Sequence, residues 1–102
     1  MSDTETPFDA GDANSVNQRA KDAKRRDRER AAVMGAIMET TPGRSWLWHL
    51  LASCRCFATT FDPNPVVMAY HEGERNVGLR LLAEIHRTSP EQYLQMIKEN
   101  SV

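Results

Sequence analysis

The sequence has few residues that could cross-link a small domain or hold a metal. Its two cysteines, Cys54 and Cys56, are separated by one residue, whereas structural zinc sites usually space paired cysteines by two to four residues. Without a second cysteine pair, His49 and His71 complete only a weak set of ligands. We therefore expect no metal site and no cofactor, and we interpret the cysteines as buried thiols in a reduced compartment.

Long apolar runs are also missing. No stretch approaches the ~18–20 apolar residues that are needed to cross a bilayer, and the N-terminus lacks the basic-then-apolar order of a signal peptide. The sequence therefore predicts a protein without a membrane span that is made and used in a cytosol.

The first 30 residues lack the apolar side chains that a core needs, because they hold only Met1, Phe8, Val16 and a few alanines. We expect residues 1–30 to form an arm and a charged helix, and residues 31–102 to form a helical core domain. Residues 1–15 are acidic and rich in small polar residues, so we predict that they are disordered unless a partner orders them, with Phe8 as an anchor.

The net charge of −1 conceals two opposite blocks. Residues 1–18 carry four acids and no base, and residues 19–30 carry seven bases and three acids, a net +4. The segment Val16–Met38 has helix-forming spacing, and we expect it to dock by its last two turns while its first half projects into solvent. The docking residues are Val33, Met34, Ile37 and Met38.

The basic run Lys21–Arg30 has three interpretations, which the sequence leaves open. It can be a solvated helix face, a contact for a protein partner or a contact for nucleic acid phosphates. Interleaved aromatics are absent, and the acids dilute its charge. The candidate partner-binding residues in this run are Arg25, Arg26, Arg28 and Arg30.

Three further helices are expected, over residues 42–54, 65–87 and 90–99. Thr41 is the predicted N-cap of the first, with Pro42 at its first helical position. The core face of this helix is expected to hold Trp46, Leu47, Leu50, Leu51 and Cys54. Trp48 lies off that face, where it can anchor a partner or stack on Arg44.

The loop that follows is expected to plug the core with Phe57 and Phe61, and the central helix follows it. The helical spacing places Tyr70, Val77, Gly78, Leu81, Leu82 and Ile85 on the core face. Glu74 falls inside this stripe, so it either lies beyond the end of the core or has a partner. The partner is expected to be an Arg, a His or a Trp, and the alternative is that Glu74 serves as a functional acid. Gly73 and Gly78 each cost about 1 kcal/mol in a helix. This cost predicts close approach of another backbone at both glycines, or else a helix that breaks near Gly73 and starts again.

The last helix has a strong start signal, with Ser89 as cap, Pro90 first and Gln92 where a capping box needs it. Its inward-facing residues are expected to be Tyr93, Leu94, Met96 and Ile97. The resulting fold class is all-α, with three core helices and a projecting N-terminal helix.

Catalytic motifs are weak. The run from His71 to Arg75 begins like a zinc-protease HExxH, but Arg75 stands where the second histidine is required. An acid–base pair of His71 and Glu74 remains an alternative, so an enzyme is a rival hypothesis. We otherwise expect no catalytic residues.

A series of residues resembles a known family. It begins at Gly43 and Arg44, continues through Trp46 and Trp48, and reaches its most specific part in the run EGERNVGLRLLAEI, residues 72–85. In this respect the chain resembles the small tailed-phage protein family first named from a Bordetella podovirus, over about residues 41–99.

The resemblance implies a phage-encoded protein, made in the cytoplasm of an infected bacterium and associated with virion structure or assembly. It brings no catalytic residues. We expect a non-enzymatic protein near the portal and tail or the internal core, present as a multi-copy ring that contacts portal or tail subunits. The rival within the phage is a DNA-binding accessory of packaging or transcription that uses Lys21–Arg30.

Overall fold

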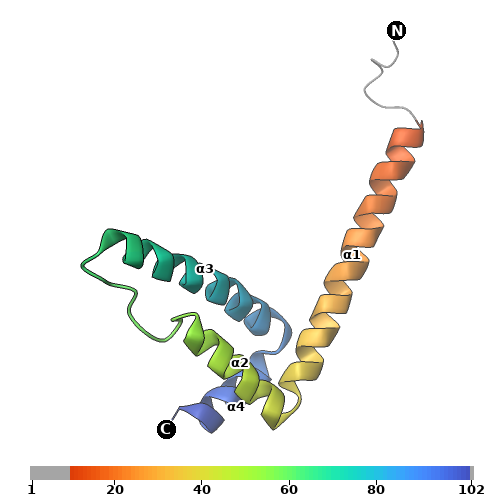
Figure 1. Cartoon of the computed structure of the whole chain (residues 1–102). Helices are drawn as coiled ribbons and strands as arrows, with labels where there is room; N and C mark the ends of the chain where they lie inside the picture. The colour runs from red at the N-terminus through yellow and green to blue at the C-terminus, as the bar shows by residue number, and fades with distance from the viewer. Residues whose placement is uncertain (1–9, 102) are drawn as a thin grey trace. The chain divides into compact units, whose positions relative to one another are not determined.

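The computed structural model describes residues 10–101, with side chains from Asp12 onward. It contains four helices and no strand within that range, which confirms the all-α prediction (Figure 1). The helices are α1 (Ala10–Met38), α2 (Thr41–Ser53), α3 (Pro65–Thr88) and α4 (Pro90–Asn100). The chain divides into two compact units, Met1–Arg30 and Ala31–Val102.

The helix in the first unit begins earlier than the sequence predicts. Residues 10–15 are helical, so the prediction of disorder is wrong for them. Phe8, the expected anchor, lies outside the described residues. Nearly every side chain of residues 12–30 is exposed, which fits the scarcity of apolar residues in this segment.

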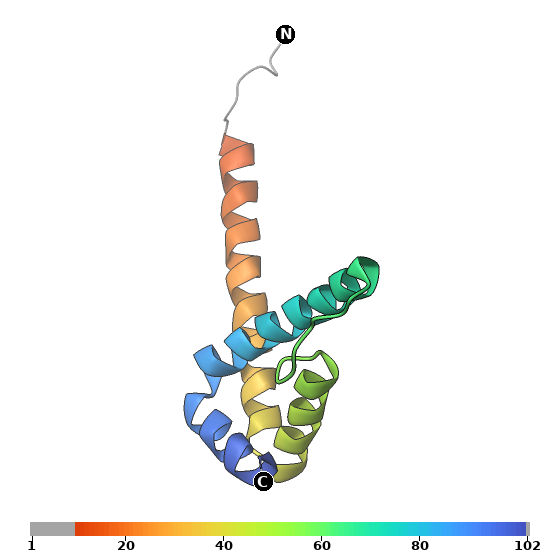
Figure 2. The same cartoon turned by 90° about the vertical axis from the view of Figure 1, so that its left-hand side faces the viewer.

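The second unit has a core built by all four helices. Six hydrophobic side chains are buried in it: Met34, Met38, Leu47, Leu51, Ile85 and Met96. α2, α3 and α4 pack against one another in pairs (Figure 2), and the last turns of α1 add the two methionines. The predicted docking by the end of α1 is confirmed for Met34 and Met38, whereas Val33 is exposed.

Each start of a core helix has a local cause. Thr40, and not Thr41, caps α2, because its Oγ1 accepts a hydrogen bond from the Gly43 N–H at 3.0 Å. Asn64 caps α3 by accepting from the N–H groups of Val66 and Val67. Ser89 occupies the cap position of α4, but its side chain makes no capping hydrogen bond, so the predicted capping box is not formed.

The core face of α3 keeps Gly78, Leu81, Leu82 and Ile85 of the predicted set and loses Tyr70 and Val77. Val77 is exposed, and so is Tyr70 at 68%, while Gly78 and Ile85 are buried. On α4, Met96 is buried but Leu94 is exposed. Phe61, expected to plug the core, is 72% exposed. The core is therefore narrower than apolar spacing predicts, and large hydrophobic side chains remain on the surface.

Candidate partner-binding surface

The turn between α1 and α2 is fixed by a close backbone contact. A Cβ placed at Gly43 would collide with the carbonyl of Ile37 and come within 2.9 Å of Thr40 Oγ1. Only glycine therefore allows the end of α1 and the start of α2 to approach this closely. The contact sets which side chains of the two helices become neighbours.

Arg44 fastens the same turn to α4. Its guanidinium donates to both carboxylate oxygens of Glu99, at 2.9 and 2.8 Å, and to the Met38 carbonyl at 2.8 Å. The Met38 carbonyl has no partner within α1, because the last carbonyls of a helix lack an intrahelical donor. The hydrogen bonds from Arg44 lower the pKa of Glu99 to about 2.

Hydrophobic side chains gather on the outside of this turn. Val33 and Ile37 lie one turn apart on α1, and Trp46 and Leu50 lie one turn apart on α2, flanking the contact of Ile37 with Gly43. We call these four residues the junction surface. Val33 and Trp46 are each 59% exposed, and Ile37 and Leu50 pack partly against the core.

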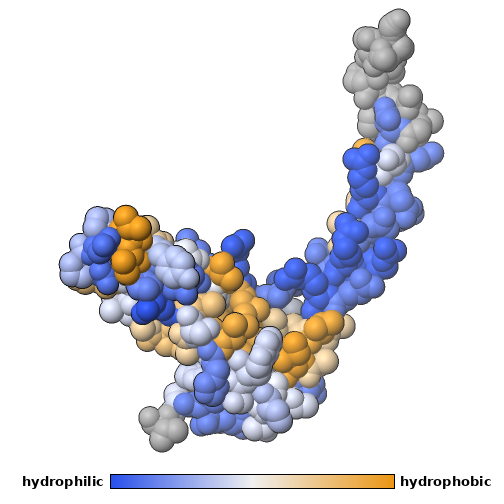
Figure 3. Space-filling model, in the orientation of Figure 1, coloured by the Kyte–Doolittle hydropathy of each residue, from blue (hydrophilic) through white to orange (hydrophobic). Residues whose placement is uncertain are grey.

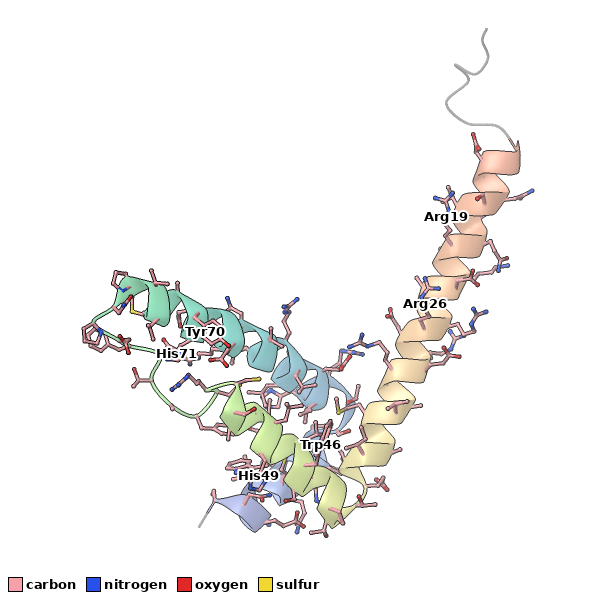
Figure 4. All side chains as sticks on the ribbon, viewed as in Figure 1. Arg19, Arg26, Trp46, His49, Tyr70 and His71 are labelled. Carbon is pink, nitrogen blue, oxygen red and sulfur yellow. The ribbon has the colours of Figure 1, made fainter. Side chains whose placement is uncertain are left out.

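The figures show this surface directly. In Figure 3 hydrophobic side chains gather where the last turns of α1 meet α2, in contrast to the hydrophilic surface of the rest of α1. Figure 4 shows Trp46 in that region of α2. Tryptophan is one of the residues enriched in protein-binding hot spots, and a contiguous exposed apolar patch is typical of an interaction site.

The two tryptophans exchange the positions that the sequence predicts. Trp48 is half-buried and packs against the core, with its ring stacked on Phe57 at a centroid distance of 4.4 Å. It does not stack on Arg44, whose guanidinium is held by Glu99. The placement of Trp46 in the core and Trp48 outside it is therefore wrong, while the role of Trp48 in partner binding stays a prediction.

The four candidate arginines of α1 are all exposed: Arg25, Arg26, Arg28 and Arg30. The structure does not bring them together on one side. Arg26 shares a side of the helix with Arg19 (Figure 4), whereas Arg25 and Arg28 belong to another side by helical spacing. Arg25 pairs with Asp22 at 3.3 Å. Their role in binding stays a prediction.

Glu74 is paired, as the sequence predicts. Its Oε1 lies 3.2 Å from His71 Nδ1 and 3.7 Å from Arg55 Nε. The carboxylate side chain is 33% exposed, so it sits at the edge of the core and not within it. Arg55 comes from the turn after α2, and the pair therefore ties that turn to α3.

The two thiols lie against α3 at Gly78. A Cβ added there would collide with Cys56 Sγ and come within 2.7 Å of Cys54 Cβ. Close approach therefore occurs at this glycine, but by two cysteine side chains and not by the predicted backbone. At Gly73 nothing lies within 4 Å, so that half of the prediction is wrong. The pKa of the Cys56 thiol is raised, mainly by burial and to a smaller extent by the charge of the neighbouring Cys54.

Residues 10–101 contain no group of three His, Cys, Asp or Glu side chains that could hold a metal ion. None of the helices in that range is both long and apolar enough to span a bilayer.

These features define a small all-α protein whose core domain exposes an apolar surface. The chain belongs to the Bbp19-like phage proteins, since the model of that family matches residues 34–98. The match confirms the resemblance seen in the sequence and identifies a phage protein. No curated protein and no solved structure gives a significant match.

Proposed function

We propose that this phage protein is a non-enzymatic component of the virion or of its assembly, and that it docks on another virion protein through the junction surface. The observation that carries the proposal is the 59% exposure of both Trp46 and Val33, on the two helices that meet at the contact of Gly43 with Ile37. Leaving these side chains in water is unfavourable by roughly 25 cal/mol for each Å² of apolar area. A partner that covers them therefore gains a hydrophobic contact.

The proposed partners are portal or tail subunits, with the internal core as the alternative location. Small helical proteins suit ring assemblies in which many copies repeat one contact, so we propose a multi-copy ring. The proposed location is the virion, after synthesis in the host cytoplasm.

The alternative hypothesis, an enzyme that uses His71 and Glu74, has weaker support than the virion role. His71 and Glu74 contact each other, but Glu74 also faces Arg55, and this arrangement accounts for the carboxylate as a structural link between the α2 turn and α3. The packaging or transcription accessory is the remaining rival, and it differs from our proposal because such a protein need not stay in the particle.

Complementation of a phage that lacks this gene tests the proposal. Copies per particle are counted by mass spectrometry of purified virions for the wild type and for Trp46→Ser. Phe61→Ser is the matched control, because Phe61 is an exposed aromatic on a loop away from the junction surface. We expect Trp46→Ser to lower incorporation at least tenfold and the control to leave it unchanged, with both proteins folded by circular dichroism.

Two results would contradict the proposal. Absence of the wild-type protein from purified particles would exclude a virion component and favour an accessory role. Normal incorporation of Trp46→Ser would show that the particle recruits the protein through another surface.

A further inference from the structure

One side of α1 carries only bases. Each residue of an α-helix turns by about 100°, so Lys21, Lys24, Arg25 and Arg28 fall within one sector of about 100°. All four side chains are exposed. We call them the basic face.

The acids of the same segment lie outside this sector. By the same spacing Asp22 and Glu29 follow one edge of the basic face and Asp27 follows the other. Asp22 pairs with Arg25 at that edge, at 3.3 Å, and accepts a hydrogen bond from Gln18. In the sequence the acids dilute the charge of this run. The helix keeps Asp27 and Glu29 outside the basic face, and Asp22 reaches it only at Arg25.

The composition of the basic face fits phosphates better than a protein surface. Protein interfaces have a core of apolar and aromatic side chains from which lysine is depleted, and helical spacing places no such side chain among these four residues. Phosphate contacts need only positive charge and a reach of several ångströms, which Lys and Arg supply.

The length of the basic face also agrees with the spacing of phosphates along duplex DNA. From Lys21 to Arg28 the helix rises by about 10 Å, and duplex DNA carries one negative charge for about every 1.7 Å of its axis. The basic face therefore spans roughly six phosphates with four cations. This ratio permits contact by all four bases without crowding.

We propose that α1 binds the phosphate backbone of double-stranded DNA through the basic face, without regard to base sequence. This inference goes beyond the virion role and does not rest on it, because the residues belong to the first unit and not to the junction surface. A particle protein with both surfaces would contact a protein neighbour and the genome.

Fluorescence anisotropy of the full chain with a labelled duplex of about 25 base pairs tests the inference. Affinity is measured between 50 and 200 mM NaCl. Four phosphate contacts predict that a plot of log affinity against log salt concentration has a slope of about −3.6. The affinity should therefore fall about 150-fold between 50 and 200 mM NaCl. A second duplex of unrelated sequence should give the same values.

Two double variants locate the contact. Lys24→Gln with Arg28→Gln removes half of the basic face and should reduce the slope to about −1.8, with at least tenfold weaker binding at 50 mM NaCl. Arg19→Gln with Arg26→Gln removes the same charge from the opposite side of α1 (Figure 4). This control should keep the slope and lose less than threefold in affinity.

Three results would overturn the proposal. The first is no binding of the wild type to DNA at 50 mM NaCl and micromolar protein. The second is an equal loss in both double variants, which would indicate diffuse attraction and not a defined face. The third is displacement of the DNA by polyglutamate at equal charge concentration, which would assign the basic face to an acidic protein. Circular dichroism confirms that the variants keep the helix, since glutamine is a good helix former.

Discussion

Arg55 adopts a backbone conformation that non-glycine side chains disfavour. Its φ is 63°, the only positive value at a non-glycine residue in the described range. It closes α2 in a Schellman arrangement, because the Cys56 N–H reaches the Leu51 carbonyl at 3.2 Å and the Arg55 N–H reaches that of Ala52 at 3.0 Å. Glycine usually occupies this position, since a Cβ in the left-handed region costs about 1–2 kcal/mol.

We expect Arg55→Gly to raise the free energy of unfolding by about 0.5–1 kcal/mol. The relief of left-handed strain exceeds the loss of the exposed pair with Glu74, which is worth about 0–1 kcal/mol. Urea denaturation measures the change. Glu74→Gln serves as the control, because it removes the carboxylate charge from the contacts with Arg55 and His71 and leaves the backbone at residue 55 unchanged. A lower urea midpoint for Arg55→Gly would show that the pair outweighs the strain.

The link between Arg44 and Glu99 predicts a dependence of stability on pH. The hydrogen bonds from Arg44 and Gln95 lower the pKa of Glu99 from 4.5 to about 2 in the folded state. A group with a lowered folded pKa contributes stability above its unfolded pKa and loses it as the pH falls toward the folded value. The contribution of Glu99 is therefore complete above about pH 5 and lost between about pH 4.5 and 2.

The matching experiment compares urea midpoints of the wild type and Glu99→Gln from pH 6.5 to pH 2.5. We expect the wild type to be more stable at pH 6.5, and the difference between the two proteins to shrink as the pH falls. The other carboxyl groups are common to both proteins and cancel in the difference. A difference that stays constant over this range would show that Glu99 titrates normally in the folded protein.

At the scale of the element, the two glycines of α3 predict opposite effects of alanine. Gly78 packs against Cys54 and Cys56, so a Cβ there overpacks the contact, which typically costs 1–3 kcal/mol. Gly73 has open space around its Cα, so Gly73→Ala should add about 0.5–1 kcal/mol through higher helix propensity. Thermal denaturation of both variants distinguishes these signs, and a stabilising Gly78→Ala would contradict the close approach.

Helix positions could be predicted from the sequence better than helix faces. Pro42, Pro65 and Pro90 mark helix starts because proline fits the first turn, and the three core helices begin at or one residue before them. Faces depend on which neighbours a helix meets. Trp46 and Leu47 lie on neighbouring parts of one apolar stripe, and spacing alone does not reveal that only Leu47 is covered.

Only part of the candidate site could be predicted from the sequence. The bases of α1 could be located, but the separation of acids from the basic face requires that residues 21–28 form one regular helix. The junction surface depends on the contact of Gly43 with the Ile37 carbonyl. A glycine inside the first turn after a Thr-Pro start is the signal in the sequence that could have indicated this contact.

At the scale of the whole molecule, the two units have unequal roles in stability. Among the described residues, the six buried hydrophobic side chains all belong to the unit Ala31–Val102. The exposed segment 12–30 contributes none of them, so its helix has little to stabilise it in isolation beyond local pairs such as Asp22 with Arg25. The first unit is therefore available to contact partners without affecting the core.

Deleting residues 1–30 should separate folding from function. We expect the truncated chain to keep a cooperative thermal transition with a melting temperature close to that of the full chain, because Met34 and Met38 remain. We also expect fewer copies of it in purified particles, since the deletion removes the exposed side chains of residues 12–30 that a neighbouring subunit or the genome would contact. Loss of the cooperative transition would show that the arm belongs to the core. Normal incorporation of the folded truncation would show that the junction surface alone recruits the protein, and the basic-face double variant would then report on DNA contact independently of recruitment.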